Sequence, residues 1–195
     1  AAAFSIRQIG FSYVGISLDG IGEVHDRFRG KAGAFDGAVQ AFRHCREVGQ
    51  KAGLRLTLTS HTIDSLPEIL DFIEAEDIPR VCFYHLVFSG RGAGLQLVDP
   101  ERLRGAIDTI LERVREWDAT GHHREVLTVD QPADGAYLYL KLLGENPERA
   151  REAFDLMSWN GGGANSSGVG IANIDSSGNV HPDQFWQTHT PGNVR

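Results

Sequence analysis

Cysteine is scarce in this sequence, with only two among 195 residues. Cys45 lies in a helical pattern and Cys82 in an apolar strand pattern, far apart along the chain. This usage excludes a disulfide framework and a CxxC metal site. We expect both thiols to be buried packing residues, because free cysteine is among the most buried residue types. No metal-ligating set is therefore predicted within this chain.

Long apolar runs and an excess of basic residues are also lacking. No segment reaches the roughly 18 apolar residues that a membrane helix needs, and the first residues, AAAFSIRQIGF, do not read as a secretion signal. Acidic residues outnumber basic ones by 26 to 19, and both are evenly scattered. These absences predict a cytoplasmic protein with no nucleic-acid partner and no membrane partner.

What the sequence does contain is an alternation of strand and helix patterns over its first 120 residues. The expected strands cover 13–18, 54–60 and 80–88, and the expected helices cover 35–52, 66–77 and 100–120, the last with Asp99 as its N-cap. Three strand-then-helix units in succession predict parallel strands with crossover helices. The chain is somewhat shorter than a complete (β/α)8 barrel of about 250 residues.

The pattern changes after residue 121. The segment REVLTV suggests a further strand at 124–129. Two helices are expected at 133–144 and 146–158, and a hairpin is expected within 169–186 around the turn SSG. We therefore divide the chain into a first domain, 1–120, and a second region, 121–195.

The expected strands all end in polar residues. In parallel α/β sheets, ligands bind at the carboxyl ends of the strands, so these residues predict a site on one face. The alternative is that they are only turn-forming residues and helix caps. They are Ser17 and Asp19 after the first strand, Thr57, Thr59 and Ser60 at the second, and His85, Ser89, Gly90 and Arg91 at the third.

Two motifs carry a resemblance to a known family. SLDG followed by HDRFR resembles the fourth strand and the following loop of radical S-adenosylmethionine (radical SAM) enzymes with a SPASM or related C-terminal domain, and FYHLVFSGRGAG resembles their sixth strand. GVGIANIDSSGNVHPDQFW and TPGNVR are similar to the haem d1 biosynthesis branch of that family. The implied fold is α/β, a partial (β/α)6 TIM-like barrel comprising about the fourth to sixth βα units, followed by the start of an α+β accessory domain.

The resemblance also implies a set of binding residues. In the family, Ser17 and Arg29 would hold the amino-acid end of S-adenosylmethionine (AdoMet), which suits a hydroxyl and a guanidinium. Further cofactor contacts are implied for Asp19, Thr57, Thr59 and His85, and substrate contacts for His181 and Asp183. No catalytic residue is assigned.

The implied activity belongs to the full-length family member. There, a reduced [4Fe–4S] cluster cleaves AdoMet to a 5′-deoxyadenosyl radical, which abstracts hydrogen from a tetrapyrrole of the didecarboxysirohaem type, and propionate side chains are lost. The partners would be that tetrapyrrole and an electron donor.

One departure limits the resemblance: the cluster-binding CxxxCxxC is absent, and so are the C-terminal cysteines of an auxiliary cluster. The chain therefore resembles an internal fragment that is inactive alone. Two alternatives stay open, a peptide-modifying maturase of the same family and a non-catalytic remnant or binding module.

Overall fold

The computed structural model describes residues 2–87, 94, 96–159 and 167–195. The chain separates into two compact units, Ala1–Val129 and Asp130–Arg195. Each unit is described here by itself. Among the described helices, none combines the length and the apolar character that crossing a bilayer requires.

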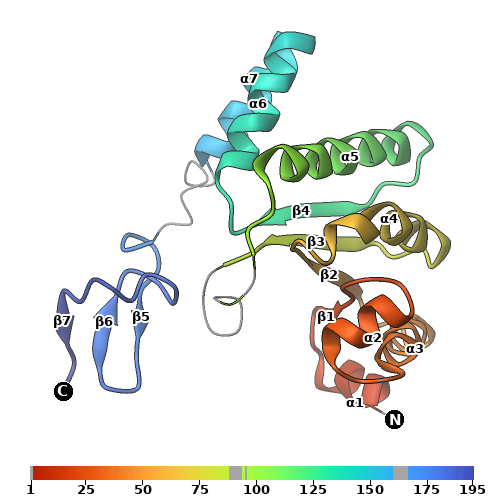
Figure 1. The fold of residues 1–195 in the computed structure, drawn as a ribbon, viewed down its shortest axis with the longest axis horizontal. Coiled ribbons are helices and arrows are strands. Elements are labelled where there is room, and N and C mark those ends of the chain that lie inside the picture. Colours follow the sequence, from red (N-terminus) through yellow and green to blue (C-terminus); the bar gives the residue numbers. More distant parts are fainter. Residues whose placement is uncertain (1, 88–93, 95, 160–166) are drawn as a thin grey trace. The chain divides into compact units, whose positions relative to one another are not determined.

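The first unit is built on a four-stranded parallel sheet in the order β1-β2-β3-β4. Figure 1 shows the crossover helices α3, α4 and α5 along one side of this sheet. The expected α/β fold with parallel strands is confirmed. In chain order the elements are α1 (Ala2–Ile9), β1 (Val14–Ser17), α2 (Glu23–Arg29), α3 (Ala34–Glu47), β2 (Ala52–Leu58), the 3₁₀ turn η1 (Ile63–Ser65), α4 (Leu66–Ala75), β3 (Arg80–His85), α5 (Pro100–Ala119) and β4 (Glu125–Val129).

The core of this unit lies between the sheet and its helices. Leu54, Leu56 and Leu58 alternate along β2 and are at most 1% exposed, and Val81 and Phe83 on β3 are fully buried. Alternate residues of a strand point to opposite faces, so these five side chains define the helix-covered face. The helices contribute apolar stripes at a spacing of three and four residues, as amphipathic helices do.

On β1 and β2, the opposite face of the sheet carries polar side chains that reach solvent. Ser17 at the end of β1 is exposed and is the register partner of Arg55 on β2, which is also exposed. Thr57, two residues further on, is half-buried and faces the same way. The sequence LRLTLT thus directs leucines into the core and polar side chains to the opposite face.

Two expectations about the local structure were wrong. The segment HDRFR, expected in a loop, lies on the seven-residue helix α2. The helix expected at 35–52 ends at Glu47, because Gly49 adopts a left-handed conformation with φ +67° and stops it. The strand that follows therefore begins at Ala52.

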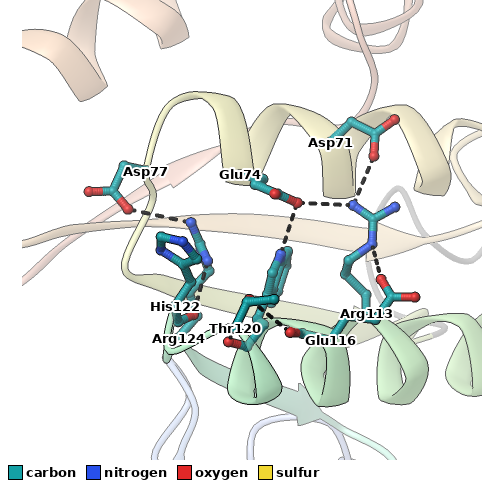
Figure 2. A network of polar contacts seen from close by, with 9 residues as sticks. Asp71, Glu74, Asp77, Arg113, Glu116, Thr120, His122 and Arg124 are labelled. Atoms are coloured by element: carbon teal, nitrogen blue, oxygen red, sulfur yellow. Dashed lines mark hydrogen bonds and ion pairs between the residues drawn. The ribbon is translucent and has the colours of Figure 1, made fainter.

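Helices α4 and α5 are joined by a network of polar contacts along their shared edge (Figure 2). The guanidinium of Arg113 lies 2.8 Å from Asp71, 3.6 Å from Glu74 and 3.3 Å from Glu116. The indole N–H of Trp117 donates to Glu74 at 3.1 Å. One cation thus bridges both helices, and the buried Trp117 shares the Glu74 carboxylate with it.

Arg124 continues this network at the start of β4. Its guanidinium lies 4.7 Å from the ring centre of Trp117, donates to the carbonyl of His122 at 3.0 Å and pairs with Asp77 at 3.4 Å. These contacts hold β4 beside β3, with Arg80 opposite Glu125. The first compact unit therefore includes β4 and extends to Val129. The division at residue 120 into a barrel part and an accessory region stays a prediction.

The second unit contains two helices and a small antiparallel sheet. Helices α6 (Ala133–Glu145) and α7 (Pro147–Trp159) pack on each other, with Tyr139 and Phe154 in ring contact at 5.7 Å. The expected hairpin is confirmed as β5 (Asn173–Ile174) and β6 (Asn179–His181), and β7 (Gly192–Asn193) adds a third strand.

The burial of Leu56 gives a test of this core. Replacing Leu56 with Ala removes a fully buried side chain and is expected to lower the free energy of unfolding by about 2–5 kcal/mol. Leu97→Ala is the matched control, because Leu97 is 74% exposed and should change stability by no more than about 0.5 kcal/mol. Urea denaturation followed by circular dichroism measures both. Equal losses in the two variants would contradict the assignment of the core.

Candidate functional site

The carboxylate of Asp19 organises the carboxyl end of β1. Asp19 is only 2% exposed, and its Oδ1 accepts a long hydrogen bond of 3.5 Å from the backbone N–H of Thr57. Its Oδ2 forms an ion pair with Arg29. The parallel ladder runs up to this point, since the N–H of Leu18 donates to the carbonyl of Arg55 at 2.9 Å. Asp19 therefore links β1, β2 and α2.

Two residues of helix α2, four positions apart, hold the helix against Asp19. His25 and Arg29 are four residues apart and lie on one helix face, and both turn toward Asp19. Gly20 allows α2 to start this close to β1, because a Cβ at Gly20 would lie 2.5 Å from a methyl carbon of Val24. Its φ of +155° also disfavours other residues.

His25 is held as a neutral imidazole. It is 2% exposed, and the backbone N–H of Asp19 donates to its Nδ1 at 2.9 Å. Burial lowers the pKa of His25; the Asp19 carboxylate opposes this shift and the Arg29 guanidinium adds to it. An accepting Nδ1 places the proton on Nε2.

Asp26 connects α2 to the next helix. Its carboxylate accepts from the backbone N–H of Gly33 at 2.6 Å and of Phe35 at 2.8 Å, at the first turn of α3. These hydrogen bonds lower the pKa of Asp26. A carboxylate at a helix N-terminus also suits the helix dipole. The two helices are therefore fixed to each other.

Arg29 keeps the capacity to bind an anion. Its side chain is 38% exposed while it pairs with Asp19, and a guanidinium has five N–H donors, more than one carboxylate can use. The hydroxyl of Ser17 is exposed two residues before Asp19. Of the residues expected to bind the cofactor, the structure thus gathers Asp19, Arg29 and Thr57, with Ser17 at the same strand end.

The other two expected cofactor contacts are placed differently. Thr59 is fully buried, and its hydroxyl lies 3.1 Å from that of Thr62 and accepts from the N–H of His61 at 3.2 Å, so it closes the turn after β2. His85 is 6% exposed and is the register partner of the core residue Leu58. Their roles as cofactor contacts remain predictions, and Ser89, Gly90 and Arg91 lie outside the described residues.

In the second unit, His181 and Asp183 both have local structural partners. The ring of His181 lies between the carbonyl of His189, at 3.0 Å, and the carboxylate of Asp175, at 3.3 Å. Asp183 accepts from the hydroxyl of Ser167 at 2.5 Å and also caps the following turn. Substrate contacts by His181 and Asp183 remain predictions.

Among the residues that the structure describes, no three His, Cys, Asp or Glu side chains gather as a metal ion would require. Cys45 and Cys82 are both buried, as the sequence predicted.

Two polar residues of the first unit were overlooked at the level of sequence. His25 belongs to HDRFR, and its spacing of four from Arg29 was the signal that both face one way. Arg55 interrupts the leucines of β2 and lies across Gly15, where a Cβ would come within 2.4 Å of its Nε. Strict alternation along that strand indicated its position on the face opposite the leucines.

Comparisons with known proteins identify relatives of this chain and solved structures that share its fold. The chain is 51% identical over 195 residues to Fe-coproporphyrin III synthase of Methanosarcina barkeri, covering 99% of this chain and 48% of the relative. It is 40% identical to pre-heme d1 synthase of Dinoroseobacter shibae, and this match covers 97% of this chain and 48% of the relative. The chain thus spans about half the length of these relatives. No protein-family model matches it.

Among solved structures, anSMEcpe with bound AdoMet superposes with a TM-score of 0.63 at 16% identity, over 98% of this chain and 49% of that one. This likeness shows the fold, a part of the TIM-like barrel of radical SAM enzymes. The resemblance found in the sequence, to this family and to its haem-forming branch, is confirmed by the homologues.

The lowered pKa of His25 predicts a pH dependence. The folded chain binds a proton at His25 less readily than the unfolded chain, whose histidines titrate near 6.5. The stability that His25 contributes should therefore be complete above about pH 6.5 and decrease as the pH falls below it. Urea denaturation at about pH 7.5 and about pH 5.5 measures this, and His25→Asn should flatten the difference. His44→Asn, at an exposed position, should leave the difference unchanged; equal slopes in all three proteins would refute the prediction.

Asp175 gives a second pH test, in the hairpin. Hydrogen bonds, chiefly from the side chain and backbone of Asn179, lower the pKa of Asp175 to about 2. The ionised carboxylate of Asp175 should therefore stabilise the hairpin above about pH 4, and this stabilisation should be lost as the pH falls toward 2. The amide proton shifts of Ser177 and Asn179, which donate to Asp175, should titrate with that midpoint and not titrate in Asp175→Asn. A titration midpoint near pH 4 would contradict the lowered pKa of Asp175.

Proposed function

We propose that this chain, a homologue of the radical SAM enzymes of haem synthesis, is part of an AdoMet-dependent enzyme that removes side chains from a tetrapyrrole of the didecarboxysirohaem type. The observation that supports this most directly is the Asp19–Arg29 pair at the carboxyl end of β1. The identity to two tetrapyrrole-forming enzymes, 51% and 40%, supports the substrate class.

The residues at the end of β1 fit the amino-acid end of AdoMet. Arg29 would bind the α-carboxylate with the donors that Asp19 leaves free, since guanidinium and carboxylate pair in a bidentate manner. The exposed hydroxyl of Ser17 would accept from the α-ammonium. Asp19 would hold Arg29 in place, and His25 would keep α2 seated against Asp19. Together these groups complement a zwitterion.

AdoMet would supply the radical chemistry when a [4Fe–4S] cluster reduces it, but the residues of this chain do not fit the cluster. Cluster ligands are closely spaced thiolates, whereas Cys45 and Cys82 are distant in sequence and buried. The role proposed for this chain is therefore to bind and orient the cofactor and the substrate. An electron donor for the cluster is proposed as a partner.

The expected product is of the haem d1 type, formed by loss of propionate side chains. A second candidate product is Fe-coproporphyrin III, which the 51% identity to the synthase of that name favours. A peptide substrate has less support, because both relatives described above are named for tetrapyrroles. The solved structure, at 16% identity, bears on the fold alone.

The direct test uses a protein that carries this chain at the full length of its relatives. It is reconstituted with iron and sulfide under anaerobic conditions and given AdoMet, a reductant and didecarboxysirohaem. Release of 5′-deoxyadenosine together with a tetrapyrrole that has lost propionates is expected by mass spectrometry. Fe-coproporphyrin III as the product would select the second candidate, and failure to release the nucleoside would refute the proposal.

AdoMet binding in that protein tests the site itself. Ser17→Ala and Arg29→Gln are each expected to weaken AdoMet binding, Arg29→Gln by about tenfold or more, because a hydrogen bond to a charged group contributes about 1.5–3 kcal/mol. Arg104→Gln, at an exposed position of α5, is the matched control. Isothermal titration calorimetry measures the affinity. Since Arg29→Gln also leaves Asp19 unpaired, Ser17→Ala serves as the variant that does not disturb the fold, and unchanged affinity in it would exclude Ser17 from the site.

A further inference from the structure

A cavity of about 390 Å³ opens between helix α2 and the turn that follows β2. Its lining consists of Val24, Arg27 and Phe28 from α2 and His61 from the turn. The volume lies at the low end of the range of about 300–1,000 Å³ typical of small-molecule sites. Both segments follow the carboxyl ends of parallel strands, where α/β proteins bind their ligands.

Helix α2 presents two different faces. His25 and Arg29 turn toward Asp19 and belong to the AdoMet site proposed above. Val24, Arg27 and Phe28 are spaced by three and four residues, so they share another face and line the cavity. The seven-residue helix α2 therefore lies between the proposed AdoMet site and the cavity.

The turn that carries His61 is fixed by its neighbours. The hydroxyl of Thr62 donates to the carbonyl of Thr57 at 2.5 Å, and the N–H of Thr59 donates to the hydroxyl of Thr62 at 2.9 Å. The backbone N–H of His61 donates to the hydroxyl of Thr59 at 3.2 Å. Because Thr59 and Thr62 are fully buried, the backbone at His61 is held in place while its side chain reaches the cavity.

The lining combines positive charge with apolar walls. Arg27 and His61 are exposed, and within the described part of the chain no carboxylate is recorded against either side chain. Val24 and the ring of Phe28, which is 37% exposed, supply apolar surface beside them. A guanidinium and an imidazole next to an aromatic ring suit a carboxylate carried on a flat, apolar molecule.

We propose that Arg27 and His61 bind a side-chain carboxylate of the tetrapyrrole, with Phe28 against the ring that carries it. This inference rests on the proposed function and adds to it the residues that recognise the substrate. Arg27 would pair with the carboxylate and His61 would donate a hydrogen bond to it. The cavity holds one arm and its pyrrole ring, and the rest of the macrocycle lies outside it.

Porphyrin binding to the 195-residue chain tests this without turnover. Metal-free coproporphyrin III, which carries four carboxylates, is titrated while its Soret absorbance and the tryptophan fluorescence are recorded, and its tetramethyl ester is the uncharged comparison. Arg27→Gln is expected to raise the Kd of the acid about tenfold, and His61→Ala about threefold. Arg27→Lys should restore part of the affinity. Arg104→Gln is the matched control and should bind like the parent chain.

The ester separates a carboxylate site from simple apolar contact. The parent chain and Arg27→Gln should bind the ester equally, because the charge that Arg27 recognises is missing. Unchanged binding of the acid by Arg27→Gln, an equal loss with the ester, or no binding by the parent chain would each overturn the inference. So would a loss of AdoMet affinity instead of porphyrin affinity in the full-length Arg27→Gln protein, since Arg27 would then belong to the cofactor site.

The two proposals can fail separately. Nucleoside release by the full-length protein supports the proposed function whatever the Kd of Arg27→Gln, whereas porphyrin binding concerns only the cavity. Suppose that the full-length protein releases 5′-deoxyadenosine and that the Arg27→Gln variant binds coproporphyrin III as tightly as the parent chain. The proposed function would then stand, and the proposed carboxylate site at Arg27 would be refuted.

Discussion

The buried carboxylate of Asp19 is the interaction on which the functional edge of the sheet depends. A carboxylate that is 2% exposed needs partners, because an unpaired charge in the interior is costly. Arg29 supplies the opposite charge and His25 accepts the Asp19 backbone N–H, and both come from α2. Asp19 therefore decides where α2 lies, and α2 in turn decides which side chains reach the strand ends.

Helix α2 concentrates the chemistry of this edge in five consecutive residues. His25 and Arg29 serve Asp19, Asp26 caps α3, and Arg27 and Phe28 face the cavity beside His61. A loop would leave such side chains free to turn, whereas a helix fixes their directions at 100° intervals. Cofactor and substrate recognition are thus proposed for two different faces of one short helix, and the helix geometry sets the angle between these faces.

The network between α4 and α5 has a different role. Arg113, Trp117 and Arg124 tie these helices to each other and to the start of β4, through the contacts that Figure 2 shows between α4, α5 and Arg124. They keep the sheet in register under its helices. This separation lets the helix-covered face provide stability, while Ser17, Arg55 and Thr57 remain on the opposite face and available for binding.

The sequence by itself determined the strands, the crossover helices, the hairpin and the resemblance to enzymes of haem synthesis, because apolar periodicity, capping residues and the SLDG motif are local signals. Only the tertiary structure decided that HDRFR is helical, that Thr59 closes a turn, and that His61 meets Arg27 across a cavity. These outcomes depend on contacts between segments that are distant along the chain. Local preference does not encode such contacts, since the seven residues of α2 are held as a helix by Asp19 and by α3 as much as by their own propensity.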